Sequence, residues 1–312
     1  MTHFIKALML LPLHVAFCSA QSAYNAPKVQ HAYGLPEAKP KEKGTLTVDS
    51  EGLTFTGKSS RYIIPGPAIL AVSTGSERVE LWGTTGRIVR MAIPNGGGLA
   101  AAGVMHHKVN ELTVEFHDAR GAYHGAVFYL PGEDAARILE SYSRIAPSHS
   151  GTANESETPA PVCQNSSGSP HNVLVAAPDW NQAEVPAAYR ALVYEHVVDR
   201  LRRVDGIGHV YREGEIDYQD ACSRYTVRIS IVSFKRGNQV KRATMGPIGF
   251  FAGTTQMTFN ANITGASGQL NVTEQVKATV RGESESKNVA DGAAKKLAKR
   301  YAAALKQLET TK

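Results

Sequence analysis

The 312-residue sequence has only three cysteines and no run of 18 or more apolar residues. Three cysteines are too few for a disulfide scaffold or a zinc array. Without a long apolar run, no transmembrane helix is predicted for the mature chain. Hydrophobic residues make up 42% of the chain and charged residues 20%, which excludes wholesale disorder. At roughly 150 residues per domain, the length predicts about two globular domains.

Catalytic and metal-binding signatures are also missing. The sequence contains neither G-x-S-x-G nor H-E-x-x-H. Four histidines lie within 19 residues, at His106, His107, His117 and His124. Because adjacent strand residues point to opposite faces, we expect surface histidines and no metal or other cofactor. An acidic group precedes a predicted strand and is expected to be a solvated loop: Glu213, Glu215, Asp217 and Asp220.

The N-terminus has the three parts of a secretory signal peptide. Lys6 provides the positive region, residues 7–17 are apolar, and Cys18-Ser19-Ala20 supplies small residues before cleavage at Gln21. Phe17 before Cys18 argues against lipidation, which needs a small residue there. We therefore predict that residues 1–20 are removed and that the protein is bacterial and periplasmic or secreted.

Removal of the signal peptide leaves two cysteines, Cys163 and Cys222, in an oxidising compartment. A bridge between them would close a 60-residue loop. The chain-entropy model gives such a bridge about 4 kcal/mol of stabilisation. Two separate buried thiols are the alternative, and the sequence leaves both open.

Composition divides the remaining chain into two modules. Residues 21–41 have no apolar period, and residues 146–170 are rich in Ser, Thr, Pro, Gly and Asn without any aromatic residue. Such segments cannot bury enough surface to offset their ordering entropy, so we predict a disordered N-terminal segment and a disordered linker. The folded modules are expected at residues 42–145 and 171–312.

Residues 42–145 show short alternating strands followed by a helix over 133–145. This order resembles the pleckstrin-homology and GRAM domains, which implies a small β barrel with a C-terminal helix. The lipid-binding members grip phosphates with a basic loop between their first two strands. Here that loop is Asp49-Ser50-Glu51-Gly52, which would repel phosphate. The resemblance therefore favours a protein- or peptide-binding scaffold.

Residues 171–312 predict a strand, a helix, several antiparallel strands and a final helix. This order, with GIGHVY, RATMGPIGFFAG and VADGAAKKLA, resembles an uncharacterised family of bacterial envelope domains whose fold is similar to the N-terminal domain of TolB and to CsgG. The resemblance implies a periplasmic assembly or interaction module, an α/β sandwich with two helices on one antiparallel or mixed sheet. The fold class predicted for the whole chain is α+β.

Two surface features are candidates for interaction. The sequence from residue 171 onward holds 20 basic and 14 acidic residues, and a cluster on the last helix is a candidate contact for an anionic surface or acidic partner: Lys295, Lys296, Lys299 and Arg300. A solvated helix face is the alternative, and nucleic acid is disfavoured because basic–aromatic interleaving is missing. The Gly-rich stretch 245–253 supplies a candidate apolar patch or, alternatively, a core crossing: Ile248, Phe250 and Phe251.

These patterns together predict an exported bacterial protein without catalytic activity that binds or assembles with a protein or envelope component. The oligomeric state and the ligand stay open. The alternative is a hydrolase acting on envelope material through a site that no motif reveals. A convergent cluster of titratable groups in a pocket would favour that alternative.

Overall fold

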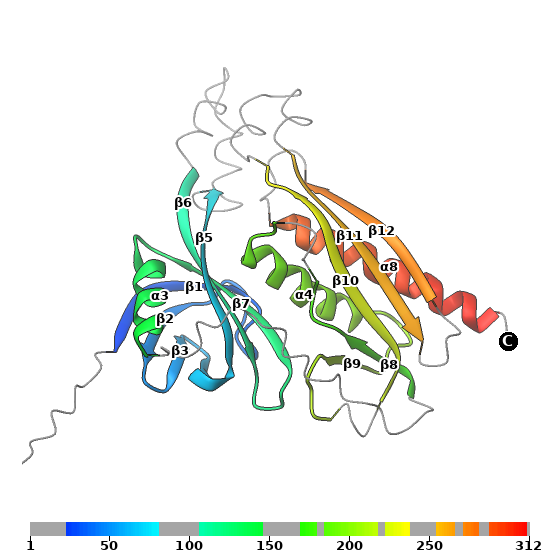
Figure 1. Cartoon of the computed structure of the whole chain (residues 1–312), viewed down its shortest axis with the longest axis horizontal. Coiled ribbons are helices and arrows are strands. Elements are labelled where there is room, and N and C mark those ends of the chain that lie inside the picture. The colour runs from blue at the N-terminus through cyan, green and yellow to red at the C-terminus, as the bar shows by residue number, and fades with distance from the viewer. Residues whose placement is uncertain are drawn as a thin grey trace, which may run out of the picture.

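The structure, a computed structural model, describes residues 23–80, 106–145, 169–179, 184–217, 222–237, 254–265, 271–280 and 287–310. Within these ranges the chain forms a seven-stranded sheet and a five-stranded sheet with helices α3, α4 and α8 (Figure 1). Strand residues clearly outnumber helical residues, so the prediction of an α+β class was wrong and the fold is mostly β. None of the helices in these ranges is long and apolar enough to cross a bilayer.

The first sheet runs in the order β4-β3-β2-β1-β7-β6-β5, and its paired neighbours are antiparallel. Its strands are β1 Tyr24–Tyr33, β2 Lys43–Asp49, β3 Gly52–Gly57, β4 Arg61–Pro65, β5 Ile69–Glu80, β6 His106–His117 and β7 Tyr123–Leu130, with a short 3-10 helix η1 at Gly66–Ala68. Among the described residues β4 and β5 are the two edges and no ladder joins them. The predicted small barrel was therefore wrong: this sheet is open, and a second layer covers it instead of its own edge strands closing it.

The prediction that residues 21–41 are disordered was also wrong, because β1 lies at the centre of the first sheet. Ala26, Val29 and His31 are fully buried. The ladder with β2 shifts register between Ala26 and Val29, and Lys28 has a positive φ of 59°. A bulge of this kind changes the phase of the side chains along a strand. The apolar alternation of β1 is thereby broken in the sequence, which explains why no strand period was visible.

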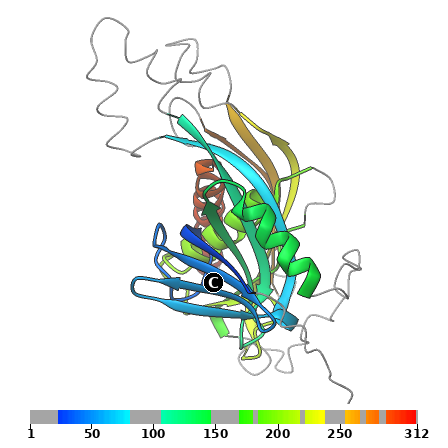
Figure 2. The ribbon, with the colours of Figure 1, turned by 90° about the vertical axis from the view of Figure 1, so that its left-hand side faces the viewer.

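The helix predicted over residues 133–145 is α3, Asp134–Ile145. It covers the outer face of the first sheet, the side turned toward the viewer in Figure 2. Ala135 and Ile138 pack into the hydrophobic core on this face, together with buried residues of β2, β3, β6 and β7. The helix buries one stripe and leaves its polar side in solvent, as the amphipathic pattern predicts.

The second sheet runs β12-β11-β10-β8-β9 and is mixed. Its strands are β8 Ser169–Val175, β9 His209–Arg212, β10 Ser223–Lys235, β11 Thr255–Gly265 and β12 Asn271–Val280. β8 runs parallel to β9 and β10, whereas β10–β11 and β11–β12 are antiparallel. Helix α4, Ala187–Leu201, connects the parallel pair β8 and β9 as a crossover. Helix α8, Asn288–Thr310, packs beside α4 and against β12.

The sequence did not predict how the two sheets are arranged relative to each other. Helix α4 determines this arrangement. Its side chains are buried on nearly every side, including Ala188, Ala191, Tyr194, Glu195 and Val198. A helix that is apolar all round lies inside a protein rather than on its surface. Figure 1 shows α4 between β7 of the first sheet and β10 of the second. The molecule is therefore layered as helix, sheet, helices and sheet.

Candidate functional site

The inner face of the first sheet carries acidic side chains that are buried against the helices. Glu111 and Glu115 lie on β6 and are 3% and 5% exposed. Glu111 pairs with Lys287, just before α8. Glu115 accepts a hydrogen bond from the Tyr123 hydroxyl at 2.9 Å and lies 3.3 Å from Arg190 of α4. These acids therefore join the sheet to both helices.

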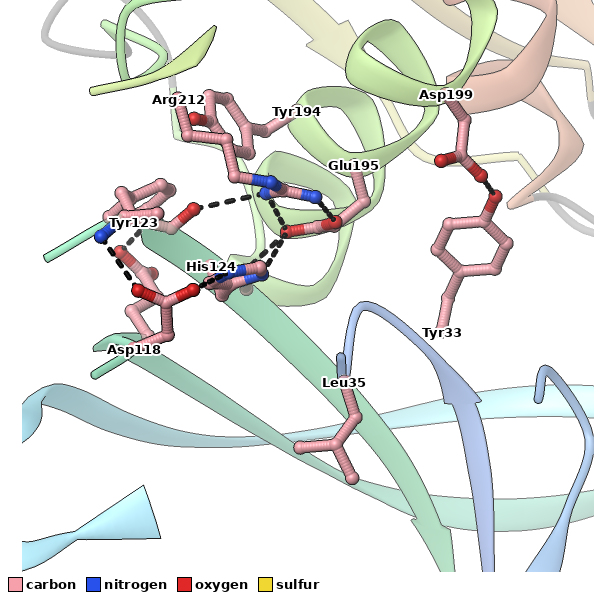
Figure 3. A network of polar contacts seen from close by, with 12 residues as sticks. Tyr33, Leu35, Asp118, Tyr123, His124, Tyr194, Glu195, Asp199 and Arg212 are labelled. Atoms are coloured by element: carbon pink, nitrogen blue, oxygen red, sulfur yellow. Dashed lines mark hydrogen bonds and ion pairs between the residues drawn. The ribbon is translucent and has the colours of Figure 1, made fainter. Parts of the chain in front are cut away.

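Glu195 and Arg212 form the centre of this junction (Figure 3). Arg212 at the end of β9 donates from Nη1 to Glu195 Oε1 at 2.9 Å and from Nη2 to Oε2 at 2.7 Å. Both side chains are less than a tenth exposed. Burial opposes ionisation of Glu195, but the Arg212 charge and its hydrogen bonds outweigh that effect and lower the pKa of Glu195. The pair is thus a buried, ionised, bidentate salt bridge.

The Glu195–Arg212 pair also forms hydrogen bonds with the backbone of β7, beyond the point where β1 ends at Tyr33. Gly125 N donates to Glu195 Oε1 at 3.0 Å, and Arg212 Nη1 donates to the Tyr123 carbonyl at 3.0 Å. Tyr123 N donates to the Glu213 carbonyl at 2.9 Å. Groups from the second module therefore satisfy backbone atoms that a longer β1 would pair. A strand edge left without partners would cost free energy when buried.

The approach of the layers depends on glycine. A Cβ placed on Gly125 would lie 2.6 Å from Ala191 Cβ of α4. At the neighbouring hairpin, Gly121 and Gly214 have φ of +77° and +79°, and a Cβ on either would lie within 2.5 Å of the other's carbonyl oxygen. Only glycine permits both the conformation and the contact.

His124 was expected at the surface, but it is 6% exposed and lies between two carboxylates (Figure 3). Its Nε2 is 3.2 Å from Asp118 Oδ2, and its Nδ1 is 3.7 Å from Glu195 Oε1. Burial opposes ionisation of Asp118, but hydrogen bonds from His124 and from the backbone N–H groups of Ala122 and Arg120 lower its pKa. The imidazole therefore links a turn of the first module to a helix of the second.

A cavity of about 370 Å³ opens beside this network. Loop 34–40, the β6–β7 hairpin, α4 and β9 line it, and both modules contribute charged side chains: Glu37, Asp118, Arg120, Glu195, Asp199, Arg202, Arg212 and Glu215. The predicted solvated acidic loop is only partly solvated, because Glu215 is 5% exposed and lies 3.2 Å from Arg120. This is a convergent cluster of titratable groups, the feature that would favour an enzyme.

Two central carboxylates of this cluster, Asp118 and Glu195, have pKa values shifted in the same direction, unlike an acid–base pair. A general acid needs a raised pKa, as for a carboxyl in an apolar pocket. Here Asp118 and Glu195 both have lowered pKa values, because the hydrogen-bond donors described above stabilise their ionised forms. Among the described residues, no group of three or more His, Cys, Asp or Glu is arranged to hold a metal ion. The geometry therefore favours a structural role for these carboxylates.

A second and larger cavity, about 820 Å³, is a groove between the C-terminal end of α4, the start of β10 and helix α8. Six of its lining residues are basic: Arg200, Arg203, Arg224, Lys295, Lys299 and Lys306. Among the described residues that line it, Asp205 is the one carboxylate. We call this feature the basic groove. A concave surface lined by one sign of charge concentrates field lines and attracts ions of the other sign.

The sequence predicted four basic residues as a contact for an anionic partner, and the structure places them in two different surroundings. All four are exposed, but only Lys295 and Lys299 line the basic groove. Lys296 reaches the Lys277 carbonyl on β12 instead. Arg300 is not among the lining residues of the groove. The missed members, Arg200, Arg203 and Arg224, are far apart in sequence from α8, and no local pattern could join them to it.

The structure describes only some of the other predicted site residues. Ile248, Phe250, Phe251 and Cys163 lie outside the described residues. Cys222 begins the approach to β10, is fully buried and has a positive φ of 43°. The pairing of Cys163 with Cys222 stays a prediction, as does the signal peptide at residues 1–20. The linker prediction falls mainly outside the described residues, and β8 begins at Ser169.

No protein-family model matches the sequence, and no curated protein matches it. Solved bacterial structures of low similarity do match. A PelC dodecamer from Paraburkholderia phytofirmans is 13% identical, with 44% of this chain and 90% of that chain covered and a TM-score of 0.31. The hypothetical protein CT253 from Chlamydia trachomatis is 10% identical, with coverages of 44% and 98% and a TM-score of 0.32. Lipoprotein GNA1162 from Neisseria meningitidis is 9% identical, with coverages of 43% and 99% and a TM-score of 0.29. These matches assign no family, ligand or activity to this chain.

Proposed function

We propose that this chain is an exported bacterial protein without catalytic activity that binds an anionic partner in the cell envelope through the basic groove. The observation that carries the proposal is the groove itself, in which six Lys and Arg side chains surround a cavity of about 820 Å³. The sequence pattern of residues 1–20 supports an extracytoplasmic site of action.

The basic residues of the groove differ from ordinary solvated lysines because three separate elements converge there. Arg203 follows the C-terminal end of α4, Lys299 lies on α8 and Arg224 lies on β10. Clustering like charges costs self-repulsion, and a bound anion relieves it. Arg200 also pairs with Asp291 of α8, which accepts three of its hydrogen bonds at 2.7–2.9 Å. Arg200 therefore ties α4 to α8 as well as lining the groove.

Charge reversal on one helix provides a matched test. We expect Lys295→Glu/Lys299→Glu to weaken binding of polyglutamate at least tenfold in fluorescence anisotropy at low salt. Lys296→Glu/Arg300→Glu makes the same change in net charge on the same helix outside the groove. Equal losses in both variants would show that net charge alone governs binding and would refute the groove as the site. Wild-type binding should weaken as salt rises, because exposed charges are screened.

Export has its own test. Fractionation of the native host should place the protein outside the cytoplasm, and N-terminal sequencing should begin at Gln21. In the same material, thiol titration under denaturant should find neither Cys163 nor Cys222 reactive if the two are bridged. A cytoplasmic chain that still carries Met1 would contradict the envelope part of the proposal.

The hydrolase alternative rests on the junction cavity, where His124, between the carboxylates of Asp118 and Glu195, is a candidate general base. The variant His124→Gln tests the hydrolase alternative directly. Turnover of an envelope substrate by the wild type that is lost in this variant, with folding retained, would favour the enzyme over the binding protein.

A further inference from the structure

We propose that the basic groove receives an acidic amphipathic helix of a partner protein, an inference that rests on the proposed function and names its partner class. The groove combines two features that a purely ionic site does not need. Four of its basic residues are exposed, namely Arg203, Lys295, Lys299 and Lys306, whereas its apolar residues, among them Tyr225, Ala298 and Leu305, are buried or half-buried. Arg200 and Arg224 are half-buried. The four exposed charges therefore form a rim and the apolar side chains a floor.

The floor and the rim both follow helix α8. Ala298, Ala302 and Leu305 are spaced i, i+4 and i+7, so they form one stripe along the helix. Lys295 and Lys306 mark the two ends of the basic row beside it. At about 1.5 Å per residue the row extends over roughly 16 Å. The groove is thus elongated, with repeated positive charge along its length.

This geometry discriminates between kinds of anionic partner. A flat lipid surface does not enter a concave groove whose apolar residues lie at the bottom. A single lipid has one anionic head group, whereas the cations here are spread along the whole groove and on both of its sides. An amphipathic helix with acidic residues at i and i+4 repeats its charge every 5–6 Å, which matches the spacing of Lys295 and Lys299. Its apolar stripe would cover the floor, the helix-in-groove mode of recognition.

The experiment uses the full mature chain and three probes. The first is an 18-residue labelled peptide with glutamates on one helical face and leucines on the other. The second is the same composition reordered so that neither face is apolar, and the third is polyglutamate. We expect the amphipathic peptide to bind at least tenfold more tightly than the reordered peptide in fluorescence anisotropy. Its advantage should persist at high salt, because burial of apolar surface is not screened.

Variants separate the floor from the rim. Leu305→Ser should abolish most of the advantage of the amphipathic peptide and leave polyglutamate binding unchanged. Lys299→Glu should weaken all three probes, and Lys296→Glu should weaken none. Circular dichroism and urea unfolding establish that each variant is folded. Ala302→Ser is a milder second change to the floor if Leu305→Ser perturbs α8.

The outcomes distinguish this inference from the proposed function. Equal binding of the amphipathic and reordered peptides would overturn the helix partner and leave an anion-binding groove. Binding to phosphatidylglycerol vesicles without binding to either peptide would assign the groove to lipid and overturn the inference. Failure of polyglutamate, peptides and vesicles alike would refute both the inference and the proposed function.

Discussion

The junction and the basic groove use charge in opposite ways. At the junction, Glu195 and Arg212 are buried, bidentate and compensated. In the groove, Lys295 and Lys299 are exposed and share the cavity with further cations. Buried pairs of this kind fix the position of neighbouring layers, because breaking one leaves an uncompensated charge. Exposed clusters of one sign contribute little to the fold and instead attract a partner.

This difference separates the part of the molecule that holds it together from the part that we propose contacts a partner. Both regions include residues of α4, which supplies Glu195 to the junction and Arg200 to the groove. A change in one region should therefore leave the other measurable in the same protein. The predictions below use substitutions of the same type in the two regions.

The largest effect is expected from Glu195→Gln. The substitution keeps the shape of the side chain but leaves the buried Arg212 charge without its carboxylate. We expect the free energy of unfolding to fall by about 3–5 kcal/mol. Urea denaturation followed by circular dichroism measures it.

The matched control is Asp291→Asn, which breaks the Arg200–Asp291 pair between α4 and α8. That pair has similar hydrogen bonds, at 2.7–2.9 Å, but its side chains are about a third exposed. We expect a loss below about 1 kcal/mol there. Equal losses in the two variants would contradict the distinction between buried and exposed charge.

The second effect concerns the packing of the layers. In Gly125→Ala the new Cβ would lie 2.6 Å from Ala191 Cβ and 2.9 Å from its Cα. Overpacking of this kind costs about 1–3 kcal/mol. Gly292→Ala places the same methyl group in open space on α8, where no atom outside the surrounding helix backbone lies within 4 Å. It should stabilise the protein by up to about 1 kcal/mol through helix propensity. Thermal unfolding of both variants should give shifts of opposite sign.

The sequence predicted most helices and strands, but it did not predict that a second layer covers the inner face of the first sheet. The alternation of Leu112, Val114 and Phe116 correctly indicated a strand. The intervening Thr113 and Glu115 are polar, yet both are buried. Alternation identifies one core-facing side and is silent about a second layer. Two signals of that layer were present: the almost uninterrupted apolar run of β7 and the apolar residues around all of α4.

The sites were harder to predict than the elements. Lys295 and Lys299 were grouped from the sequence because a helix gathers neighbours in sequence. Glu195, Arg212 and His124 were not, because their contacts join residues between 17 and 71 positions apart. Only the packing of α4 between the sheets brings them together. Long-range pairing of single charged residues leaves no local pattern.

The third effect is a pH dependence that arises at His31, which lines the junction cavity but belongs neither to the Glu195–Arg212 pair nor to the basic groove. Its Nε2 accepts the Leu35 N–H at 3.0 Å and its Nδ1 lies 3.1 Å from the Lys39 carbonyl, which requires a neutral ring. Burial lowers the pKa of His31. The unfolded chain therefore binds more protons as the pH falls below about 6.5, and stability decreases by up to about 1.4 kcal/mol per pH unit.

In His31→Gln this decrease between pH 7.5 and 5.5 should become smaller, measured by urea unfolding at each pH. It should not vanish, because burial also lowers the pKa values of His117 and His196. An unchanged slope would show that His31 is not a source of the acid sensitivity. Binding of polyglutamate at pH 7.5 should be the same in His31→Gln and wild type, since His31 lies outside the basic groove.

The smallest effect on stability is expected in the groove, and it completes the comparison. Lys299→Gln removes one exposed charge, so the free energy of unfolding should change by no more than about 0.5 kcal/mol. Because the change relieves repulsion among neighbouring cations, a slight stabilisation is the expected sign. Polyglutamate affinity should fall in the same variant, whereas Glu195→Gln, studied at a temperature where it stays folded, should retain it. A loss of stability in Lys299→Gln comparable to that of Glu195→Gln would mean that the groove charges hold the fold together, and the division of roles between the two regions would be wrong.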